Sequence, residues 1–363
     1  MTYLHFADPG QPALTRKDLP FCRGVEAIPK PAAYGALKMA RGIVGRSPLP
    51  VLNYTSDEMS RAVGRLTAGA ASFDLVHLDS IHMIRYAGSS ARVVYDWHNI
   101  ESEALRRYSA TVASRPRRWY AKQTAAKLEA LEGEILRNAF GHVVCSGRER
   151  EQLIATTPKA RIAVVENGVD TGYFAGASGG SGQRDIVFVG TMDYYPNVEA
   201  ASSFARNIWP RLRDTLPESR LMIVGANPTP QVRALRDIAG VTVTGTVPDV
   251  RPYYRDALAA IVPLRTGGGT RLKILEAMAA GVPVVSTPLG AEGLAVTSDR
   301  DILLVEPDDA AGWARHLSQL AQPSARRAEI VSQALELVRA RYDWNTLGQK
   351  LWDTYAGWMG SGG

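Results

Sequence analysis

The stretch PLRTGGGTRLKILEAMAAGVPVVS, from Pro263 to Ser286, decides the fold. The apolar run LAAIVPL (258–264) leads into it, and three glycines separate that run from a helix-favouring segment between Thr270 and about Ala280. A second strand-like run, VPVVST, follows at once. A strand, a glycine loop, a helix and another strand are the parts of a βαβ unit in a parallel sheet. The stretch therefore predicts an α/β fold.

Two basic residues lie at the start of this helix, where a helix disfavours them. A helix N-terminus carries partial positive charge and unpaired N–H groups, so Arg271 and Lys273 each cost up to about 1 kcal/mol unless an anion lies among them. A phosphate group resolves the conflict, because glycines admit it to the backbone and the two cations balance its charge. Glu276 can accept a hydrogen bond from a hydroxyl such as that of a ribose.

The glycine loop also allows interpretations other than a phosphate site. Lys273 and Glu276 could form an exposed i, i+3 pair, with Gly267–Gly269 only a turn. A P-loop is disfavoured because no Gly-Lys-Ser/Thr follows, and Leu272 stands where a GxGxxG motif has its third glycine. These departures argue against a nucleoside triphosphatase and against a nicotinamide enzyme.

Strand-like runs alternate with helical patterns through the whole second half of the chain, which indicates a doubly wound parallel sheet. Each run ends in glycine, and Thr229 and Pro230 begin one of the helices as N-cap and first helical residue. The runs are DIVFVG (185–190), LMIVG (221–225) and VTVTG (241–245), and the helical patterns span 198–213, from Thr229 onward, and about 249–256.

In the first half, four strand-like runs carry polar residues at their carboxyl ends: FDLVHLD (73–79), ARVVYDWHN (91–99), GHVVCS (141–146) and RIAVVENGVD (161–170). In an open α/β sheet that edge faces the ligand crevice. His98, beside Asp96 and Asn99, is therefore a candidate functional residue, and the alternative is a core or capping histidine. The Gly- and Ser-rich segment 171–184 predicts a linker between two domains.

Composition narrows the class of protein. In 363 residues, 45% are hydrophobic, and 33 glycines with 21 prolines are too few for a collagen-like or low-complexity chain. Cys22 and Cys145 lie far apart in sequence, which argues against a disulfide scaffold or a structural zinc site and favours a reducing cytoplasm. No apolar run approaches the ~18 residues of a membrane span, and the N-terminus has no signal-peptide pattern.

The net charge of the chain does not decide between several kinds of partner. A net charge of +6 is compatible with anionic small molecules, nucleic acid or an anionic membrane face. The long charged segment 111–137 predicts a solvated amphipathic helix. The alternative is a basic membrane-surface face, through Arg115, Arg117, Arg118, Lys122 and Lys127.

The motifs VVENGVD, FVGTMDYYPN, IVGA, VTGTV and GGGTRLKILEAMAAGVPVVS occur in an order that resembles the retaining glycosyltransferases of family 4. The resemblance covers most of the chain. It is closest to a bacterial exopolysaccharide-type branch, in which a GGGTRxK run replaces the Glu-Gly-Phe-Gly signature of most members. The string VVYDWHNIES also resembles that branch.

The resemblance implies a GT-B fold, with two Rossmann-like doubly wound domains facing a cleft. Residues 1–170 would form the acceptor-side domain, 185–340 the nucleotide-sugar domain, and 341–363 a C-terminal helix crossing back to the first domain. MTYLHFAD looks like the second strand of such a domain, so the first βα unit is expected to be missing. An exposed apolar face would then be expected.

The resemblance also implies a nucleotide-diphosphate sugar as substrate, with no metal and no other cofactor. Arg271 and Lys273 would neutralise the leaving diphosphate, and Glu276 would bind the ribose. His98 would hydrogen-bond a hydroxyl of the donor sugar or stabilise positive charge on its ring. Gly268 replaces a family glutamate, so the identity of the sugar does not carry over. The implied donor-binding residues are Gly190, Thr191, Gly225, Thr246, Val247, Gly268, Gly269, Thr270, Arg271, Lys273 and Glu276. The residues implied to line the cleft are Asp96, Asn99, Asn167 and Gly168. A tight turn explains Asn167 and Gly168 equally well.

These features predict a cytoplasmic, retaining, hexosyl-type glycosyltransferase of exopolysaccharide or cell-surface glycan synthesis, with a glycan or lipid-linked acceptor. Peripheral contact with the inner face of the membrane is compatible with it, and no nucleic-acid partner is expected. Two rivals remain: a catalytically silent nucleotide-sugar binding protein, suggested by the missing first unit, and a sugar-nucleotide epimerase of the same fold.

Overall fold

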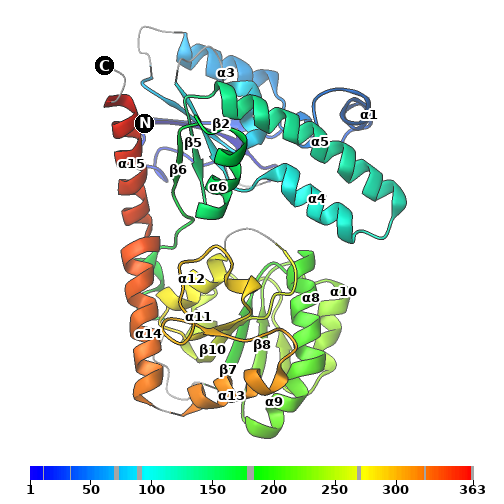
Figure 1. Ribbon diagram of the computed structural model, residues 1–363, viewed down its shortest axis with the longest axis vertical. Helices are drawn as coiled ribbons and strands as arrows, with labels where there is room; N and C mark the ends of the chain where they lie inside the picture. Colours follow the sequence, from blue (N-terminus) through cyan, green and yellow to red (C-terminus); the bar gives the residue numbers. More distant parts are fainter. Residues whose placement is uncertain are drawn as a thin grey trace. The chain divides into compact units, whose positions relative to one another are not determined.

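The computed structural model describes residues 1–10, 12–32, 34–68, 73–87, 92–177, 184–267, 271–322 and 324–360. The chain divides into two compact units, Met1–Val164 and Val165–Gly363. Figure 1 shows that each unit combines strands with flanking helices. All paired strands of the named sheets are parallel, which confirms the predicted α/β class with two Rossmann-like halves.

The C-terminal unit contains a six-stranded sheet with the order β12-β11-β10-β7-β8-β9. Chain order runs outward from β7 to β9 on one side and from β10 to β12 on the other, which is the doubly wound arrangement of a dinucleotide-binding fold. The reversal of strand order therefore lies between β7 and β10. The strands are β7 (Asp185–Val189), β8 (Arg220–Val224), β9 (Val241–Val243), β10 (Ala257–Val262), β11 (Val284–Ser286) and β12 (Leu303–Leu304).

Helices bury this sheet, and their aromatic side chains fill the core. Every residue of β10 is buried, as expected of a strand covered on both faces. Phe204 and Trp313 pack edge to face with ring centroids 5.1 Å apart. The helices are α7 (Thr171–Phe174), α8 (Tyr195–Ser203), α9 (Trp209–Thr215), α10 (Pro230–Arg233), α11 (Arg251–Arg255), α12 (Leu272–Ala279), α13 (Ala310–Ala321), α14 (Ala325–Leu337) and α15 (Trp344–Gly360).

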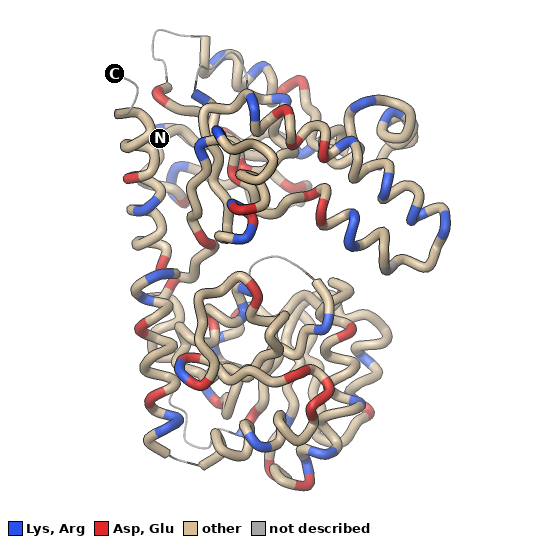
Figure 2. The backbone as a smooth tube through the Cα atoms, in the orientation of Figure 1, with Lys and Arg blue, Asp and Glu red and all other residues tan. Residues whose placement is uncertain are grey.

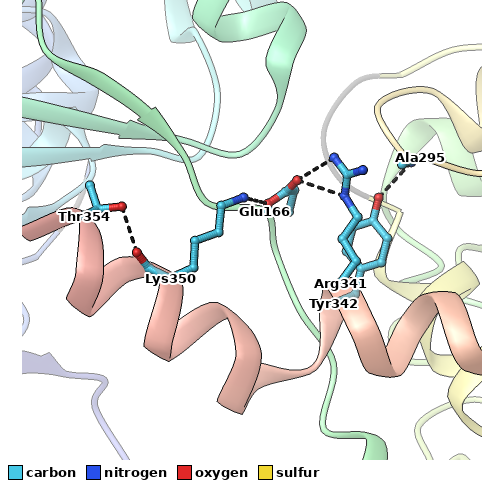
Figure 3. Close-up of polar contacts among 6 residues, drawn as sticks. All are labelled: Glu166, Ala295, Arg341, Tyr342, Lys350 and Thr354. Carbon is cyan, nitrogen blue, oxygen red and sulfur yellow. Dashed lines mark hydrogen bonds and ion pairs between the residues drawn. The ribbon is translucent and has the colours of Figure 1, made fainter.

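A buried carboxylate fastens the C-terminal helices to the start of this unit (Figure 3). Glu166 is 5% exposed and accepts hydrogen bonds from Arg341 Nη2 at 2.9 Å and from Lys350 Nζ at 2.7 Å. The neighbouring Tyr342 hydroxyl accepts a bond from the Ala295 amide at 2.7 Å. Burial alone would raise the pKa of Glu166, but the bonds from Lys350 and Arg341 outweigh it and hold that pKa below the usual glutamate value.

The N-terminal unit divides its strands between two parallel sheets, a pair β1-β2 and a sheet β3-β4-β5-β6. Leu4 and Phe6 of β1 pack against the same hydrophobic core as the four-stranded sheet. The strands are β1 (Thr2–Ala7), β2 (Gly24–Pro29), β3 (Val76–Asp79), β4 (Val93–Trp97), β5 (Gly141–Val144) and β6 (Ile162–Val164), and the helices are α1 (Ala36–Val44), α2 (Leu49–Asn53), α3 (Asp57–Thr67), α4 (Glu101–Thr111), α5 (Arg115–Asn138) and α6 (Gly147–Thr156).

The predicted linker at 171–184 stays a prediction. Within it, Thr171–Phe174 forms α7, Ala177 is buried in the C-terminal core, and residues 178–183 lie outside the described part of the chain. Among the described residues, no helix combines the length and the apolar character that crossing a membrane requires.

Candidate functional site

The C-terminal unit gathers its glycine-containing loops at one edge of the sheet. Gly190 follows β7, Gly225 follows β8, Thr246 and Val247 follow β9, and Gly267 follows β10. These four strands are neighbours and parallel, so their carboxyl ends lie along the same edge. The edge includes the reversal of strand order between β7 and β10, where ligands of doubly wound sheets bind.

Two of these glycines allow adjacent strand ends to approach each other closely. A Cβ atom on Gly225, whose φ is +152°, would lie 1.7 Å from the carbonyl oxygen of Gly190. A Cβ on Gly190 would lie 2.8 Å from Asn197 Nδ2 and 2.9 Å from Lys273 Nζ. No larger residue fits at either position without displacing its neighbours. The glycines therefore bring backbone to within contact distance of the Lys273 ammonium.

Lys273 lies in the first turn of α12 and points to the end of β7. Its Nζ donates to Asn197 Oδ1 at 2.6 Å and lies 4.6 Å from the centre of the Phe188 ring. Asn197 in turn donates from Nδ2 to the carbonyl oxygen of Thr191 at 3.0 Å. The predicted residues Gly190, Thr191 and Lys273 are thus brought together, and Asn197 joins them.

The ammonium group of Lys273 is poorly solvated. Burial, followed by the nearby positive charge of Arg271, lowers the pKa of Lys273 to about 7, and Glu276 opposes the shift. Burial raises the pKa of Glu276, and the charge of Lys273 opposes that shift. Two basic groups held this close together favour the binding of an anion.

Arg271 stands at the N-cap position of α12, one residue before the helix begins, whereas the sequence predicted it within the first turn. It is 5% exposed, and its Nη2 donates to the carbonyl oxygens of Gly267 at 3.2 Å and Leu289 at 3.3 Å. The guanidinium group is therefore held by backbone on the loops that follow β10 and β11. It supplies fixed positive charge beside Lys273.

The other predicted donor residues are less closely tied to this pair. Thr246 is exposed and Val247 packs at the margin of the core. Gly268, Gly269 and Thr270 lie outside the described residues. Their predicted roles stay predictions.

In the N-terminal unit, sheet register places five polar side chains on one face. Asp79 of β3 is the register partner of Asp96 on β4, and Trp97 is the partner of Val144. Side chains two residues apart share a face, so His77 joins Asp79, His98 joins Asp96, and Cys145 lies level with His98. His98 Nε2 is hydrogen-bonded to Asp79 Oδ1, and His77 Nε2 lies 3.6 Å from Asp96 Oδ2.

The pairing of His98 with Asp79 fixes the charge of both side chains. The bond to Asp79, followed by contact with Cys145, raises the pKa of His98 to about 10, and the bond from His98 lowers the pKa of Asp79. Burial raises the pKa of Asp96 and lowers that of His77. At neutral pH the predicted histidine is therefore an imidazolium paired with a carboxylate.

Asp96, His98 and Cys145 bring three donor atoms within 4.8 Å of one another. Nε2 of His98 is already bonded to Asp79, and the Cys145 thiol donates to the carbonyl oxygen of Trp97 at 3.5 Å. Burial raises the pKa of the Cys145 thiol, so it is neutral at pH 7. We therefore assign this cluster to hydrogen bonding and charge pairing.

Asn167 and Gly168 belong to the C-terminal unit. A Cβ on Gly168 would lie 2.6 Å from Leu347 Cδ1 and 2.7 Å from the carbonyl oxygen of Tyr342, so this glycine is needed for packing against the C-terminal segment. Their place in a cleft, with that of Asn99, stays a prediction.

Sequence reasoning did not single out Asp79 or Asn197 as site residues, and it did not predict the contact of Cys145 with His98. Asp79 was detectable, because it ends a strand-like run whose carboxyl end was expected at the ligand edge. Asn197 and Cys145 carried no signal of their own, since each depends on which strand end lies beside which.

Two glycosyltransferase family models match this chain. Residues 21–173 match Glycosyltransferase Family 4, and residues 183–323 match Glycosyl transferases group 1. Glycogen synthase of Mycobacterium tuberculosis is 28% identical over 252 residues, covering 66% of this chain and 59% of that protein. Phosphatidyl-myo-inositol mannosyltransferase of Mycolicibacterium smegmatis is 31% identical over 206 residues, covering 54% and 52%. The chain thus spans between half and three-fifths of these relatives.

Solved structures share the fold over nearly the whole chain. Sucrose-phosphate synthase from Thermosynechococcus elongatus has a TM-score of 0.68 at 19% identity, covering 99% of this chain and 89% of that chain. Anabaena Alr3699/HepE, solved in complex with UDP and glucose, has a TM-score of 0.64 at 14% identity, covering 98% and 99%. The predicted GT-B fold is confirmed.

Proposed function

We propose that this protein is a retaining, hexosyl-type glycosyltransferase that moves a sugar from a nucleoside-diphosphate sugar to a glycan or lipid-linked acceptor, without a metal ion. We place it in exopolysaccharide or cell-surface glycan synthesis, in the cytoplasm. The observation that carries the proposal is the position of Lys273 and Arg271 at the start of α12, where Gly190 lets the Lys273 ammonium approach the end of β7.

The chemistry of sugar transfer demands such a site. When the bond between the anomeric carbon and the diphosphate oxygen breaks, negative charge grows on the diphosphate. Preorganised cations and N–H groups stabilise that charge, and each such donor is worth about 3 kcal/mol in comparable sites. Lys273 is desolvated and Arg271 is held by backbone carbonyls, so both are in place before the reaction starts. Glu276, in turn, would accept a hydrogen bond from a ribose hydroxyl.

In this proposal, His98 binds the donor sugar. The sequence left two roles open for it, and its pairing with Asp79 supports one of them. An imidazolium repels positive charge on a sugar ring, but it donates a strong hydrogen bond to a sugar hydroxyl. We therefore assign His98 as a hydrogen-bond donor that holds the donor sugar, with Asp79 keeping it protonated.

The family models and the UDP-bound structural neighbour support a nucleotide-sugar donor. Incubation of the purified protein with labelled nucleotide sugars and lipid-linked or oligosaccharide acceptors tests the proposal. The expected product keeps the anomeric configuration of the donor sugar and forms equally well in the presence of EDTA. Lys273→Met should lose transferase activity, whereas the exposed control Lys159→Met should retain it.

Other outcomes would overturn the proposal in different ways. Donor binding without transfer to any acceptor would indicate a silent nucleotide-sugar binding protein. Conversion of the donor in the absence of acceptor would indicate an epimerase. Inversion of configuration at the anomeric carbon, or complete dependence on a divalent cation, would contradict the mechanism.

A further inference from the structure

Helix α1 of the N-terminal unit carries apolar side chains on its outer side. Its inward-facing residue is Gly42, which is buried so closely that a Cβ there would lie 2.9 Å from the Cβ of Leu49. Leu37, Ala40 and Val44 are spaced i, i+3 and i+7 and lie on the opposite side of the helix. Leu37 is 66% exposed and Val44 is 88% exposed.

This arrangement is the reverse of an ordinary surface helix, whose apolar stripe faces the core and whose polar side faces water. Tyr34, Met39 and Ile43 extend the exposed apolar surface on and beside the same helix. Contiguous exposed apolar side chains of this kind mark a surface of interaction.

A basic helix lies directly against α1. Lys127 of α5 donates from Nζ to the carbonyl oxygens of Gly42 and Ile43, at 2.7 Å each. Lys127 therefore holds α1 in place and is not part of a free basic face. In the preceding turns of α5, Arg115, Trp119 and Lys122 are exposed and spaced i, i+4 and i+7, away from the buried Ala121 and Ala125.

The two sequence segments that contain α1 and the N-terminal half of α5 have no acidic residues. Residues 27–56 contain four Lys or Arg and residues 104–128 contain seven, and neither segment contains Asp or Glu. Figure 2 shows the basic residues following α1 and the N-terminal half of α5. Arg106 and Arg107 are paired with Glu129 and Glu103, so the exposed positive charge of the second segment includes that of Arg115 and Lys122.

We propose that the α1–α5 face, formed by Leu37, Ala40 and Val44 of α1 with Arg115, Trp119 and Lys122 of α5, binds the surface of an anionic lipid bilayer. Apolar side chains of an interfacial helix enter the boundary between headgroups and acyl chains, and tryptophan prefers the headgroup level. Basic side chains at the same level are attracted to lipid phosphates. The combination of charge and exposed apolar area favours this occupant over an electroneutral protein surface.

The proposal adds a partner to the transferase function but does not depend on it. All of its residues lie in the N-terminal unit, whereas the diphosphate site lies in the C-terminal unit. Lipid binding and nucleotide binding can therefore fail separately, and each has its own assay.

Co-sedimentation with vesicles tests the proposal directly. The full chain is mixed with vesicles of phosphatidylcholine alone and with vesicles of equal parts phosphatidylcholine and phosphatidylglycerol, at low and at high salt. We expect binding to the anionic vesicles and loss of most of it at high salt. Equal binding to both kinds of vesicle, or to neither, would overturn the proposal.

Two variants separate the apolar from the electrostatic contribution. L37S/V44S should abolish vesicle binding, while Phe21→Ser, which alters an exposed aromatic outside the face, should leave it unchanged. R115A/K122A should weaken binding about thirty-fold, because each basic group near an anionic surface is worth about a factor of five. The control K17A/K159A removes two exposed lysines elsewhere in the unit and should have little effect.

Folding and self-association are checked on the same samples. Circular dichroism and nucleotide binding should be the same for L37S/V44S as for the unsubstituted protein. If that variant instead converts a dimer to a monomer in size-exclusion chromatography, a second copy covers the face and the lipid proposal is wrong.

Discussion

His98 and Asp79 form the ion pair on which the charge of the N-terminal site depends. Asp79→Asn should move the pKa of His98 from about 10 toward the ordinary histidine value near ~6.5, because it removes the carboxylate that stabilises the imidazolium. The measurement is an NMR pH titration of the His98 ring. Asp74→Asn, at the other end of the same strand region, is the matched control, and a His98 pKa that does not change in D79N would contradict the pairing.

The same pair makes a pH-dependent contribution to stability. The pKa of His98 is raised on folding, so its contribution is complete below the unfolded value near ~6.5 and is lost as pH rises through about 10. The pKa of Asp79 is lowered, so on the acid side the contribution fades as pH falls below ~4. The free energies of unfolding of wild type and D79N, measured with denaturant, should differ most between pH ~4 and ~6.5. The two values should become equal at about pH 10 and above.

Lys273 should take up a proton when a diphosphate binds. Its pKa of about 7 leaves the free side chain mostly neutral at pH 8, and an adjacent anion raises that pKa. Calorimetry of nucleoside-diphosphate binding at pH 8, in buffers of different ionisation enthalpy, should show uptake of most of one proton. Lys273→Met should show none and Lys159→Met should behave as wild type; no uptake by wild type would place Lys273 away from the phosphates.

At the level of elements, the contact between the ends of β7 and β8 depends on glycine. Gly225→Ala should lower the free energy of unfolding by about 3 kcal/mol or more, because its Cβ would overlap the Gly190 carbonyl oxygen at a positive φ. Gly245→Ala is the control, since its φ is +78° but no atom lies within 4 Å, and it should cost only about 1 to 2 kcal/mol. Equal losses in the two variants would show that the close approach is unimportant.

Regular βα units were predictable from sequence where apolar runs and caps were distinct. The runs at 185–190 and 221–225 became β7 and β8, and Thr229 caps α10 by accepting from the Val232 amide at 3.3 Å. The predicted helix over 198–213 is instead interrupted by a π-helical segment, Phe204–Ile208. Pro210 explains the interruption, because it has no N–H for the next helical bond and its ring crowds the preceding turn.

Other features depend on contacts that no local pattern encodes. The inverted face of α1 requires knowing that Gly42 lies against Leu49, and the Asp79–His98 pair requires the register of β3 with β4. The long charged segment predicted at 111–137 is α5, but Thr111 ends α4 instead. Spacing predicted that a helix exists there, whereas tertiary packing decides which of its faces is buried.

In the C-terminal unit as a whole, Glu166 links the chain's central segment to its last helices. Glu166→Gln should lower the free energy of unfolding by about 1 to 2 kcal/mol, a value reduced because Arg341 and Lys350 are half exposed. The pKa of Glu166 is lowered, so the difference from wild type should be present above ~4.3 and vanish as pH falls below it.

Glu329→Gln, which removes an exposed carboxylate 3.6 Å from Arg326, is the control for Glu166→Gln and should change stability very little. Chemical denaturation of both variants across this pH range makes the comparison. A loss of the same size in both, or a loss that persists in acid, would show that Glu166 does not act through its ion pairs.

Calorimetric titration of UDP, GDP and dTDP, each beside its monophosphate, tests the central claim most directly. One diphosphate should bind far more tightly than its monophosphate, and Arg271→Ala and Lys273→Ala should each weaken it by about 1.5 to 3 kcal/mol while the far-ultraviolet spectrum stays unchanged. Diphosphates that bind no better than monophosphates, or two folded variants that bind as tightly as wild type, would contradict a diphosphate site at the start of α12.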